Sequence, residues 1–222
     1  MSDPLDGFGR EARPRCQIYL ISPSAFDLEA HAAALERALS AGPVAAYQLR
    51  LKDVDDATIL AAAARLAPVC RAHDIAFILN DRAGLARACG ADGVHLGQED
   101  GSVLEARNLL GREAQIGVTC HASRHLAMEA GENGADYVAF GAFFETATKA
   151  VEHYATPEIL SWWTAISPIP CVAIGGITPA NCAPLLAAGA DFLAVAAAVW
   201  DGDPAAAVRD FLQKIEENDP AR

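Results

Sequence analysis

The chain has 222 residues, of which 52% are hydrophobic and 21% are charged. This composition is typical of a globular protein with a sizeable buried core and excludes an extended disordered chain. The 17 basic and 29 acidic residues give a net charge of −12, the opposite of the balance expected for a protein that binds nucleic acid or an anionic membrane.

Residues 1–14 mix acids and bases without an apolar centre, so we expect a flexible tail and no signal peptide. No run approaches the roughly 20 apolar residues that a membrane helix needs. The 6 cysteines form no CxxC pair and no zinc-type spacing, and we expect buried, reduced thiols. These features indicate a cytoplasmic protein.

After the tail, short apolar runs alternate with helical patterns. Strands are expected at residues 16–21, 44–50, 75–79, 93–96, 115–119, 136–140, 170–174 and 191–195. Helices are expected at residues 27–41, 53–73, 82–89, 101–110, 123–133, 156–165, 178–189 and 203–217. This alternation predicts parallel βαβ units and an α/β fold, a single-domain (β/α)₈ TIM barrel over residues 15–222. A doubly wound open sheet is the structural alternative.

The tripeptide Gly-Ala-Asp recurs at residues 90–92, 134–136 and 189–191, each time just before a predicted strand. Turns in that position lie on the N-terminal face of a barrel, away from the strand ends that carry catalytic groups. We therefore expect these three turns to be structural.

Two carboxylates follow consecutive predicted strands, Asp81 after the third strand and Asp100 after the fourth. The carboxyl ends of neighbouring parallel strands meet at one edge, so these side chains should converge. Two carboxylates with amide oxygens nearby, and no thiolate or paired His, suit a hard cation such as Mg²⁺. The sequence therefore predicts a metal-assisted reaction on a phosphorylated substrate.

Further polar or backbone groups are expected at the same end of the barrel. Gln48 and Arg50 on the second strand and Lys52 just past it alternate in sequence, and an inward Arg and Lys there could clamp a diphosphate. The remaining candidates are Asn80 after the third strand, Thr119 and His121 after the fifth, Thr146, Thr148 and Lys149 after the sixth, Gly176 after the seventh, and Ala196 and Ala197 after the eighth. The last three residues would act through backbone groups at a phosphate site near a short extra helix.

Seven motifs follow one another in this chain: YQLRLK (47–52), FILNDR (77–82), GADGVHLGQED (90–100), IGVTCH (116–121), TATK (146–149), VAIGGIT (172–178) and GADFLAVAAAVW (189–200). In this order and spacing they resemble the thiamine-phosphate synthase family. The resemblance covers nearly the whole chain, from about residue 17 to residue 200.

The resemblance implies a (β/α)₈ enzyme that requires Mg²⁺ and joins hydroxymethylpyrimidine diphosphate to a thiazole phosphate or its carboxylated form. Thiamine monophosphate and pyrophosphate would be the products, together with CO₂ where the carboxylated form reacts. The resemblance implies that the pyrimidine diphosphate is held by Gln48, Arg50, Lys52 and Asn80, and that Thr119 approaches it. Mg²⁺ would be bound by Asp81 and Asp100. The thiazole phosphate or the leaving diphosphate would be contacted by Thr146, Thr148 and Lys149, and the thiazole's phosphate would be bound by Gly176 and the backbone at Ala196 and Ala197. Catalysis would depend on Arg50, Lys149 and Thr119.

The chain departs from the family pattern in the loop after the sixth strand, where the usual GPVFPTxTK reads GAFFETATK at residues 141–149. Both prolines are missing, Glu145 adds a negative charge, and Ala197 stands where a Ser is frequent. Two alternatives stay open: a thiazole tautomerase with His121 as proton shuttle, and a non-catalytic module that binds thiazole phosphate. A homodimer is possible, and Trp162 and Trp163 are candidates for its apolar contact surface. We favour a role for both side chains in packing the outer layer of the barrel.

Overall fold

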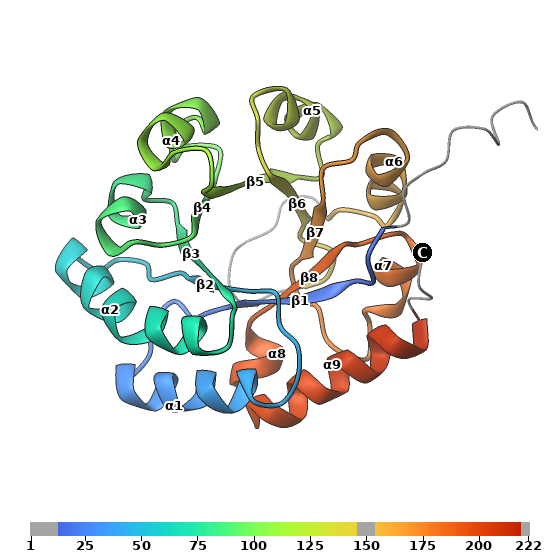
Figure 1. Cartoon of the computed structure of the whole chain (residues 1–222). Helices are drawn as coiled ribbons and strands as arrows, with labels where there is room; N and C mark the ends of the chain where they lie inside the picture. Colours follow the sequence, from blue (N-terminus) through green and yellow to red (C-terminus); the bar gives the residue numbers. More distant parts are fainter. Residues whose placement is uncertain (1–12, 146–153, 219–222) are drawn as a thin grey trace, which may run out of the picture.

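The computed structural model describes residues 13–145 and 154–218 (Figure 1). Within these ranges eight parallel strands close into a barrel, each paired with the next and β8 paired with β1. The strands are β1 Gln17–Ile21, β2 Ala46–Leu49, β3 Ala76–Asn80, β4 Gly93–Leu96, β5 Gln115–His121, β6 Tyr137–Gly141, β7 Cys171–Ile174 and β8 Phe192–Val195. The predicted TIM barrel is confirmed, and closure of the sheet excludes the open doubly wound alternative.

Helices surround the barrel on the outside, as Figure 1 shows. They are α1 Leu28–Leu39, α2 Asp56–Ala72, α3 Ala83–Cys89, α4 Val103–Leu110, α5 Arg124–Glu132, α6 Glu158–Ile166, α7 Ala183–Ala187, α8 Ala197–Trp200 and α9 Pro204–Asn218. Side-chain caps begin several of them where the sequence predicts, for example Asp27 before α1 and Ser123 before α5. No helix in the described ranges is long and apolar enough to cross a membrane.

The chain after β7 differs from the prediction of a helix over residues 178–189. Only Ala183–Ala187 is helical, because Asn181 holds the preceding residues in a turn. Its side-chain oxygen accepts the N–H of Thr178 at 2.8 Å, and its amide nitrogen donates to the carbonyl of Gly176 at 2.9 Å. This turn keeps the backbone after β7 at the barrel mouth.

The core has two parts, one between the strands and the helices and a smaller one inside the barrel. The inner part includes Tyr19, Ile78, Tyr137 and Val172, so the barrel interior is filled by side chains. In the outer part Trp163 is 1% exposed and its ring packs edge-on against Phe140, which confirms the expected outer-layer role of Trp163.

The three Gly-Ala-Asp turns share one structural task at the N-terminal face. Each Asp accepts a backbone N–H from the start of the preceding strand: Asp92 from Phe77 at 2.7 Å, Asp136 from Ile116 at 2.7 Å, and Asp191 from Cys171 at 2.8 Å. Two of these carboxylates also pair with an arginine, Asp136 with Arg107 at 2.5 Å and Asp191 with Arg13 at 2.6 Å. The turns fasten neighbouring strands together, and their predicted structural role is confirmed.

Candidate active site

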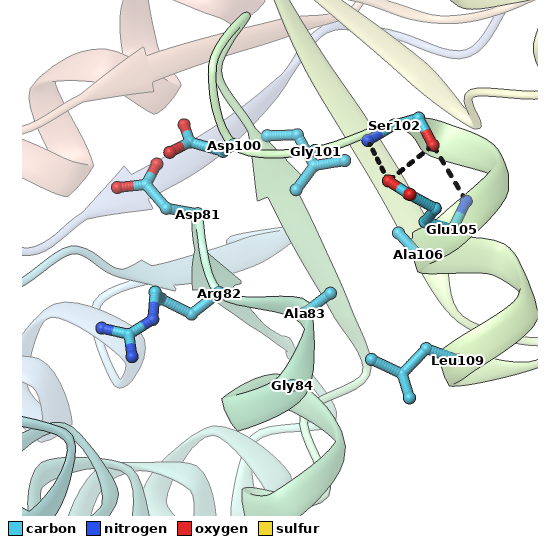
Figure 2. A pocket seen from close by; sticks show the side chains of 11 residues that line it. Asp81, Arg82, Ala83, Gly84, Asp100, Gly101, Ser102, Glu105, Ala106 and Leu109 are labelled. Carbon is cyan, nitrogen blue, oxygen red and sulfur yellow. Dashed lines mark hydrogen bonds between the residues drawn. The ribbon is translucent and has the colours of Figure 1, made fainter.

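Asp81 and Asp100 meet at the C-terminal rim of the barrel, and Figure 2 shows their carboxyl groups directed toward one another. Partial burial and the negative charge of Asp81 raise the pKa of Asp100 above its ordinary value. The two acids predicted to converge therefore do so, in an arrangement that two negative charges alone disfavour.

Local backbone geometry holds this pair in place. Asp81 has a φ of 65°, a left-handed conformation that few residues other than glycine adopt. Its N–H donates to the carbonyl of His95 on the neighbouring strand at 2.7 Å. Asp100 is turned back toward its own strand, because one of its carboxylate oxygens accepts the N–H of Gly97 at 2.9 Å. Strained backbone of this kind often marks a functional position.

The pair borders a cavity of about 310 Å³ that opens between the starts of α3 and α4 (Figure 2). Besides the two aspartates, Arg82, Leu96, Ser102 and Leu109 contribute to its lining. The start of α4 is fixed by reciprocal hydrogen bonds between Ser102 and Glu105, so this wall of the cavity is well defined.

Cationic and amide groups from β2 and β3 complete this part of the rim. The ammonium of Lys52 pairs with a carboxylate oxygen of Asp81. Arg50 is half-buried at the end of β2, and its backbone N–H donates to the hydroxyl of Ser22 at 2.8 Å. The Gln48 side chain lies deeper and is 2% exposed. The structure thus brings Lys52 to the aspartates and places Arg50 and Gln48 on the strand next to β3.

Asn80 ends β3 immediately before Asp81 and presents an unusual amide group. Its Nδ2 is buried and has no hydrogen-bond partner within the described residues. A buried donor without an acceptor costs on the order of 1–3 kcal/mol. A ligand oxygen at this point would accept from Nδ2 and remove that cost.

The donors present fit Mg²⁺. Two hard carboxylate oxygens come from adjacent strands, and a divalent cation would relieve the repulsion between them. Within the described residues no group of three or more His, Cys, Asp or Glu side chains could hold a metal ion by itself. That pattern suits Mg²⁺, which commonly takes one or two carboxylates and completes its shell with water and phosphate oxygens.

Thr119 and His121 lie on the next strand along the rim. The Thr119 hydroxyl contacts Nε2 of His95 at 2.8 Å, and its carbonyl accepts from Nε2 of Gln98 at 2.5 Å. The β5–β6 register shifts between Thr119 and His121, and β5 is longer than the sequence predicts. His121 is exposed with a φ of 51°, so its backbone, like that of Asp81, adopts the left-handed region at a strand end.

The opposite side of the mouth is formed by the ends of β6, β7 and β8. Gly176 has a φ of 64°, and a Cβ there would lie 2.2 Å from the carbonyl oxygen of Glu145. Glycine is therefore needed for the loop after β6 to approach β7. Ala196 precedes the first residue of α8, Ala197. The predicted residues Thr146, Thr148 and Lys149 lie outside the described residues.

Comparisons with known proteins agree with this geometry. A family model described as thiamine monophosphate synthase matches residues 18–199. The chain belongs to the thiamine monophosphate synthase family. A protein named thiamine-phosphate synthase from Erythrobacter litoralis is 59% identical to it over 90% of this chain and 95% of the relative. A protein of the same name from Rhodospirillum centenum is also 59% identical, over 88% of this chain and 96% of the relative.

A solved structure supports the same family. Thiamine phosphate pyrophosphorylase from Pyrococcus furiosus superposes with a TM-score of 0.78 at 30% identity, covering 90% of this chain and 96% of that one. The family match includes both rim aspartates, Lys52, Asn80 and Thr119.

Burial disfavours the reactive thiolate form of several thiols in this member of the thiamine monophosphate synthase family. None of the 6 cysteines forms a disulfide, and 5 of them are buried. Burial raises the pKa of Cys70, Cys120 and Cys171 to about 12, which keeps these thiols protonated. The prediction of buried thiols without disulfides is confirmed except at Cys89, which is only partly buried.

Sequence reasoning missed the residues beneath the rim. Tyr19, His95 and Tyr137 lie inside the barrel and hydrogen-bond to predicted site residues or to each other. Burial lowers the pKa of His95 to about 4, so its imidazole is neutral. The available signal was the position of His95 within the motif at residues 90–100.

Proposed function

We propose that this member of the thiamine monophosphate synthase family joins hydroxymethylpyrimidine diphosphate to a thiazole phosphate, or to its carboxylated form with loss of CO₂, and releases thiamine monophosphate and pyrophosphate. One observation carries the proposal: Asp81 and Asp100 converge beside Lys52 at the barrel mouth. That cluster fits a metal-bound diphosphate. The relatives named thiamine-phosphate synthase, at 59% identity over most of the chain, support the same reaction.

The reaction requires the protein to stabilise charge and to position the substrates, and it does not require a protein nucleophile. The bond that breaks joins a benzylic-type methylene carbon to a diphosphate oxygen. The electron-rich aminopyrimidine stabilises a cation at that carbon, so the diphosphate leaves with the bonding electrons before the thiazole nitrogen donates its lone pair. The protonated, buried thiols are consistent with such a route, because no covalent enzyme intermediate is needed.

The residues on the β2–β5 side would bind the diphosphate. Arg50 and Lys52 offset its negative charge, and Nδ2 of Asn80 donates to one of its oxygens. Asp81 and Asp100 would hold Mg²⁺, which supplies positive charge to stabilise the departing diphosphate. Thr119 would add a hydroxyl contact to the same group, and Gln48 would help to hold the pyrimidine diphosphate from beneath.

The β6–β8 side would bind the thiazole phosphate. Support here comes from the backbone, since the turn held by Asn181 places Gly176 at the mouth and α8 begins at Ala197 next to Ala196. Thr146, Thr148 and Lys149 belong to this proposal through the family motif alone. Lys149 would offset charge on the leaving diphosphate together with Arg50.

Two broader expectations complete the proposal. Six cysteines without a disulfide fit a reducing compartment, and we place the protein in the cytoplasm. A homodimer would require an apolar contact surface; Leu104, Met128 and Ile166 are exposed apolar side chains that could contribute to one.

The direct test is a reaction of the purified protein with both phosphorylated substrates in the presence of Mg²⁺. Thiamine monophosphate is measured after oxidation to a fluorescent product, and pyrophosphate is measured with a coupled assay. Both should appear in equal amounts, and neither should appear with a chelator or with one substrate omitted. Binding of the substrates without release of pyrophosphate would reject the synthase and favour a thiazole-phosphate-binding module.

A further inference from the structure

A chain of hydrogen-bonded side chains crosses the inside of the barrel beneath the rim. Its members come from five different strands and are, in order, Gln48, Tyr19, Tyr137, His95 and Thr119. Gln48 Nε2 lies 2.9 Å from the Tyr19 hydroxyl, which lies 2.9 Å from the Tyr137 hydroxyl. That hydroxyl lies 3.1 Å from Nδ1 of His95, whose Nε2 lies 2.8 Å from the Thr119 hydroxyl. Two predicted ligand-binding residues are therefore the two ends of one buried network.

The first link fixes the direction of donation along the chain. The amide nitrogen of Gln48 can only donate, so the Tyr19 hydroxyl accepts from it. The described part of the chain offers the Tyr19 proton no acceptor other than Tyr137. If Tyr137 instead donated to Tyr19, the Tyr19 proton would be left unpaired in a residue that is only 3% exposed. Tyr19 therefore donates to Tyr137.

The direction then passes through the histidine. Tyr137 accepts from Tyr19, and the described residues offer its own buried proton no acceptor other than Nδ1 of His95, so Tyr137 donates to that nitrogen. A neutral imidazole that accepts at Nδ1 carries its proton at Nε2, which donates to the Thr119 oxygen. The Thr119 hydroxyl proton is therefore not used within the network, which leaves it for an acceptor outside the network.

From this geometry we infer that Tyr137 and His95 are positioning residues that hold the Thr119 hydroxyl as a hydrogen-bond donor toward an anionic ligand oxygen at the rim. The identity of that anion, the diphosphate of the pyrimidine substrate, rests on the proposed function. A threonine hydroxyl that is free to rotate would present a lone pair as readily as a proton. The network fixes the Thr119 hydroxyl as a donor before the ligand binds.

A glycine on the neighbouring strand makes room for this network. Gly117 lies on β5 opposite the Tyr137 ring, and a Cβ at this position would lie 1.9 Å from a ring carbon and 2.4 Å from the hydroxyl oxygen. Tyr137 also stacks on His95 with ring centroids 5.6 Å apart, and it meets Tyr19 edge-on at 5.9 Å. The rings are therefore fixed by packing as well as by hydrogen bonds.

The tautomer of His95 tests the inference without any substrate. The protein is labelled with ¹⁵N-histidine, and the His95 signals are assigned by their loss in His95→Gln. Protonated and unprotonated ring nitrogens have well-separated ¹⁵N shifts, and we expect the pure Nε2–H form in the ligand-free protein. Tyr137→Phe removes the donor to Nδ1 and should convert the signal to a mixture of tautomers. The Nδ1–H form in the unmodified protein, or an unchanged signal in Tyr137→Phe, would overturn the inference.

Tyr47→Phe is the matched control, because Tyr47 is a buried tyrosine that contacts a different histidine, His31, at 2.8 Å. It should leave the His95 signal unchanged. The unmodified protein decides the tautomer by itself, so the inference stays testable even where Tyr137→Phe fails to fold. A protein that has the Nε2–H tautomer but makes no thiamine monophosphate would reject the proposed reaction and leave the network's direction intact.

Affinity for inorganic pyrophosphate with Mg²⁺, measured by calorimetry, gives the functional consequence. Thr119→Val and Tyr137→Phe should each weaken binding about tenfold, the value of one charge-assisted hydrogen bond, and Thr119→Ser should restore it. Combining Thr119→Val with Tyr137→Phe should weaken binding no further than Thr119→Val alone. Additive losses in the double variant would show that Tyr137 acts on stability rather than through Thr119.

Discussion

The two ends of this barrel use aspartate in opposite ways. At the N-terminal face, each of Asp92, Asp136 and Asp191 accepts a backbone N–H from the preceding strand. At the C-terminal rim, Asp81 and Asp100 face one another, and the pKa of Asp100 is raised by burial and by the charge of Asp81. The first set is satisfied by the fold itself. The second set has partners too, Lys52 for Asp81 and the N–H of Gly97 for Asp100, but its two carboxyl groups still repel each other, and an added cation would relieve that repulsion.

All five residues are aspartates, so their surroundings, and not their residue type, distinguish the structural acids from the functional ones. The N-terminal turns add neutralising partners, as Arg107 does for Asp136. The rim adds strain, since Asp81 occupies a left-handed conformation, and it leaves the neighbouring Nδ2 of Asn80 without an acceptor. Acids at the first end should support stability, and acids at the second should support binding and turnover.

The largest effect is expected for Asp81→Asn. Loss of one of two metal-binding carboxylates should lower kcat/KM by about 10³-fold, in line with the several kcal/mol that a bound metal contributes. The melting temperature should change little, because the substitution removes a repulsive charge and only a partly exposed pair with Lys52. Steady-state kinetics and thermal unfolding measure the two quantities.

His121→Ala is the matched comparison for Asp81→Asn, since both residues end a strand in the left-handed region. The synthase should lose less than about tenfold in kcat/KM without His121, because no general acid or base is required of it. A severe loss in His121→Ala together with normal turnover in Asp81→Asn would favour the thiazole tautomerase.

At the opposite end, Asp191→Ala should act on stability. It removes the acceptor for the N–H of Cys171 and the partner of Arg13, and should lower the free energy of unfolding by about 2–4 kcal/mol. Turnover per folded molecule should stay near normal. Denaturant titration measures the loss, and Asp191→Asn should lose less because its amide oxygen still accepts the N–H of Cys171.

A smaller effect is expected where the backbone supports the rim pair. In Gly97→Ala the new Cβ would lie 2.5 Å from Oδ2 of Asp100, so the carboxylate must move. Because a side-chain end can shift easily, stability should hold while kcat/KM falls about tenfold, the cost of a misplaced positioning group. Gly202→Ala, where nothing lies within 4 Å of the added carbon, should leave both quantities unchanged.

The smallest effect concerns pH and the metal-free protein. The pKa of Asp100 is raised in the folded state, so its stabilising contribution is present when it is protonated and is lost as the pH rises through that raised value. In a chelator, Asp100→Asn should therefore be slightly more stable than the unmodified protein at pH 7. The advantage should vanish below the ordinary aspartate pKa of about 3.9. An advantage that grows in acid would contradict the repulsion between the two acids.

Much of this comparison could be predicted from the sequence, for physical reasons that particular residues make clear. Short apolar runs placed the eight strands, and parallel neighbours made the meeting of Asp81 and Asp100 predictable. The network beneath the rim could not be predicted. Strands of a parallel barrel are buried on both faces, so Tyr19 and Tyr137 read as ordinary core residues, with no pattern to show which face looks inward. The composition of residues 178–189 also predicted a helix from residue 178, where the structure has a turn held by the side chain of Asn181.

The central claim is that Asp81 and Asp100 jointly bind Mg²⁺ together with a diphosphate. Calorimetric titration of inorganic pyrophosphate into the metal-free protein, with and without added Mg²⁺, tests it most directly. We predict binding that requires Mg²⁺ in the unmodified protein and is lost in both Asp81→Asn and Asp100→Asn, while Asp136→Asn binds normally. Pyrophosphate binding of equal strength in a chelator, or in either rim variant, would contradict the account.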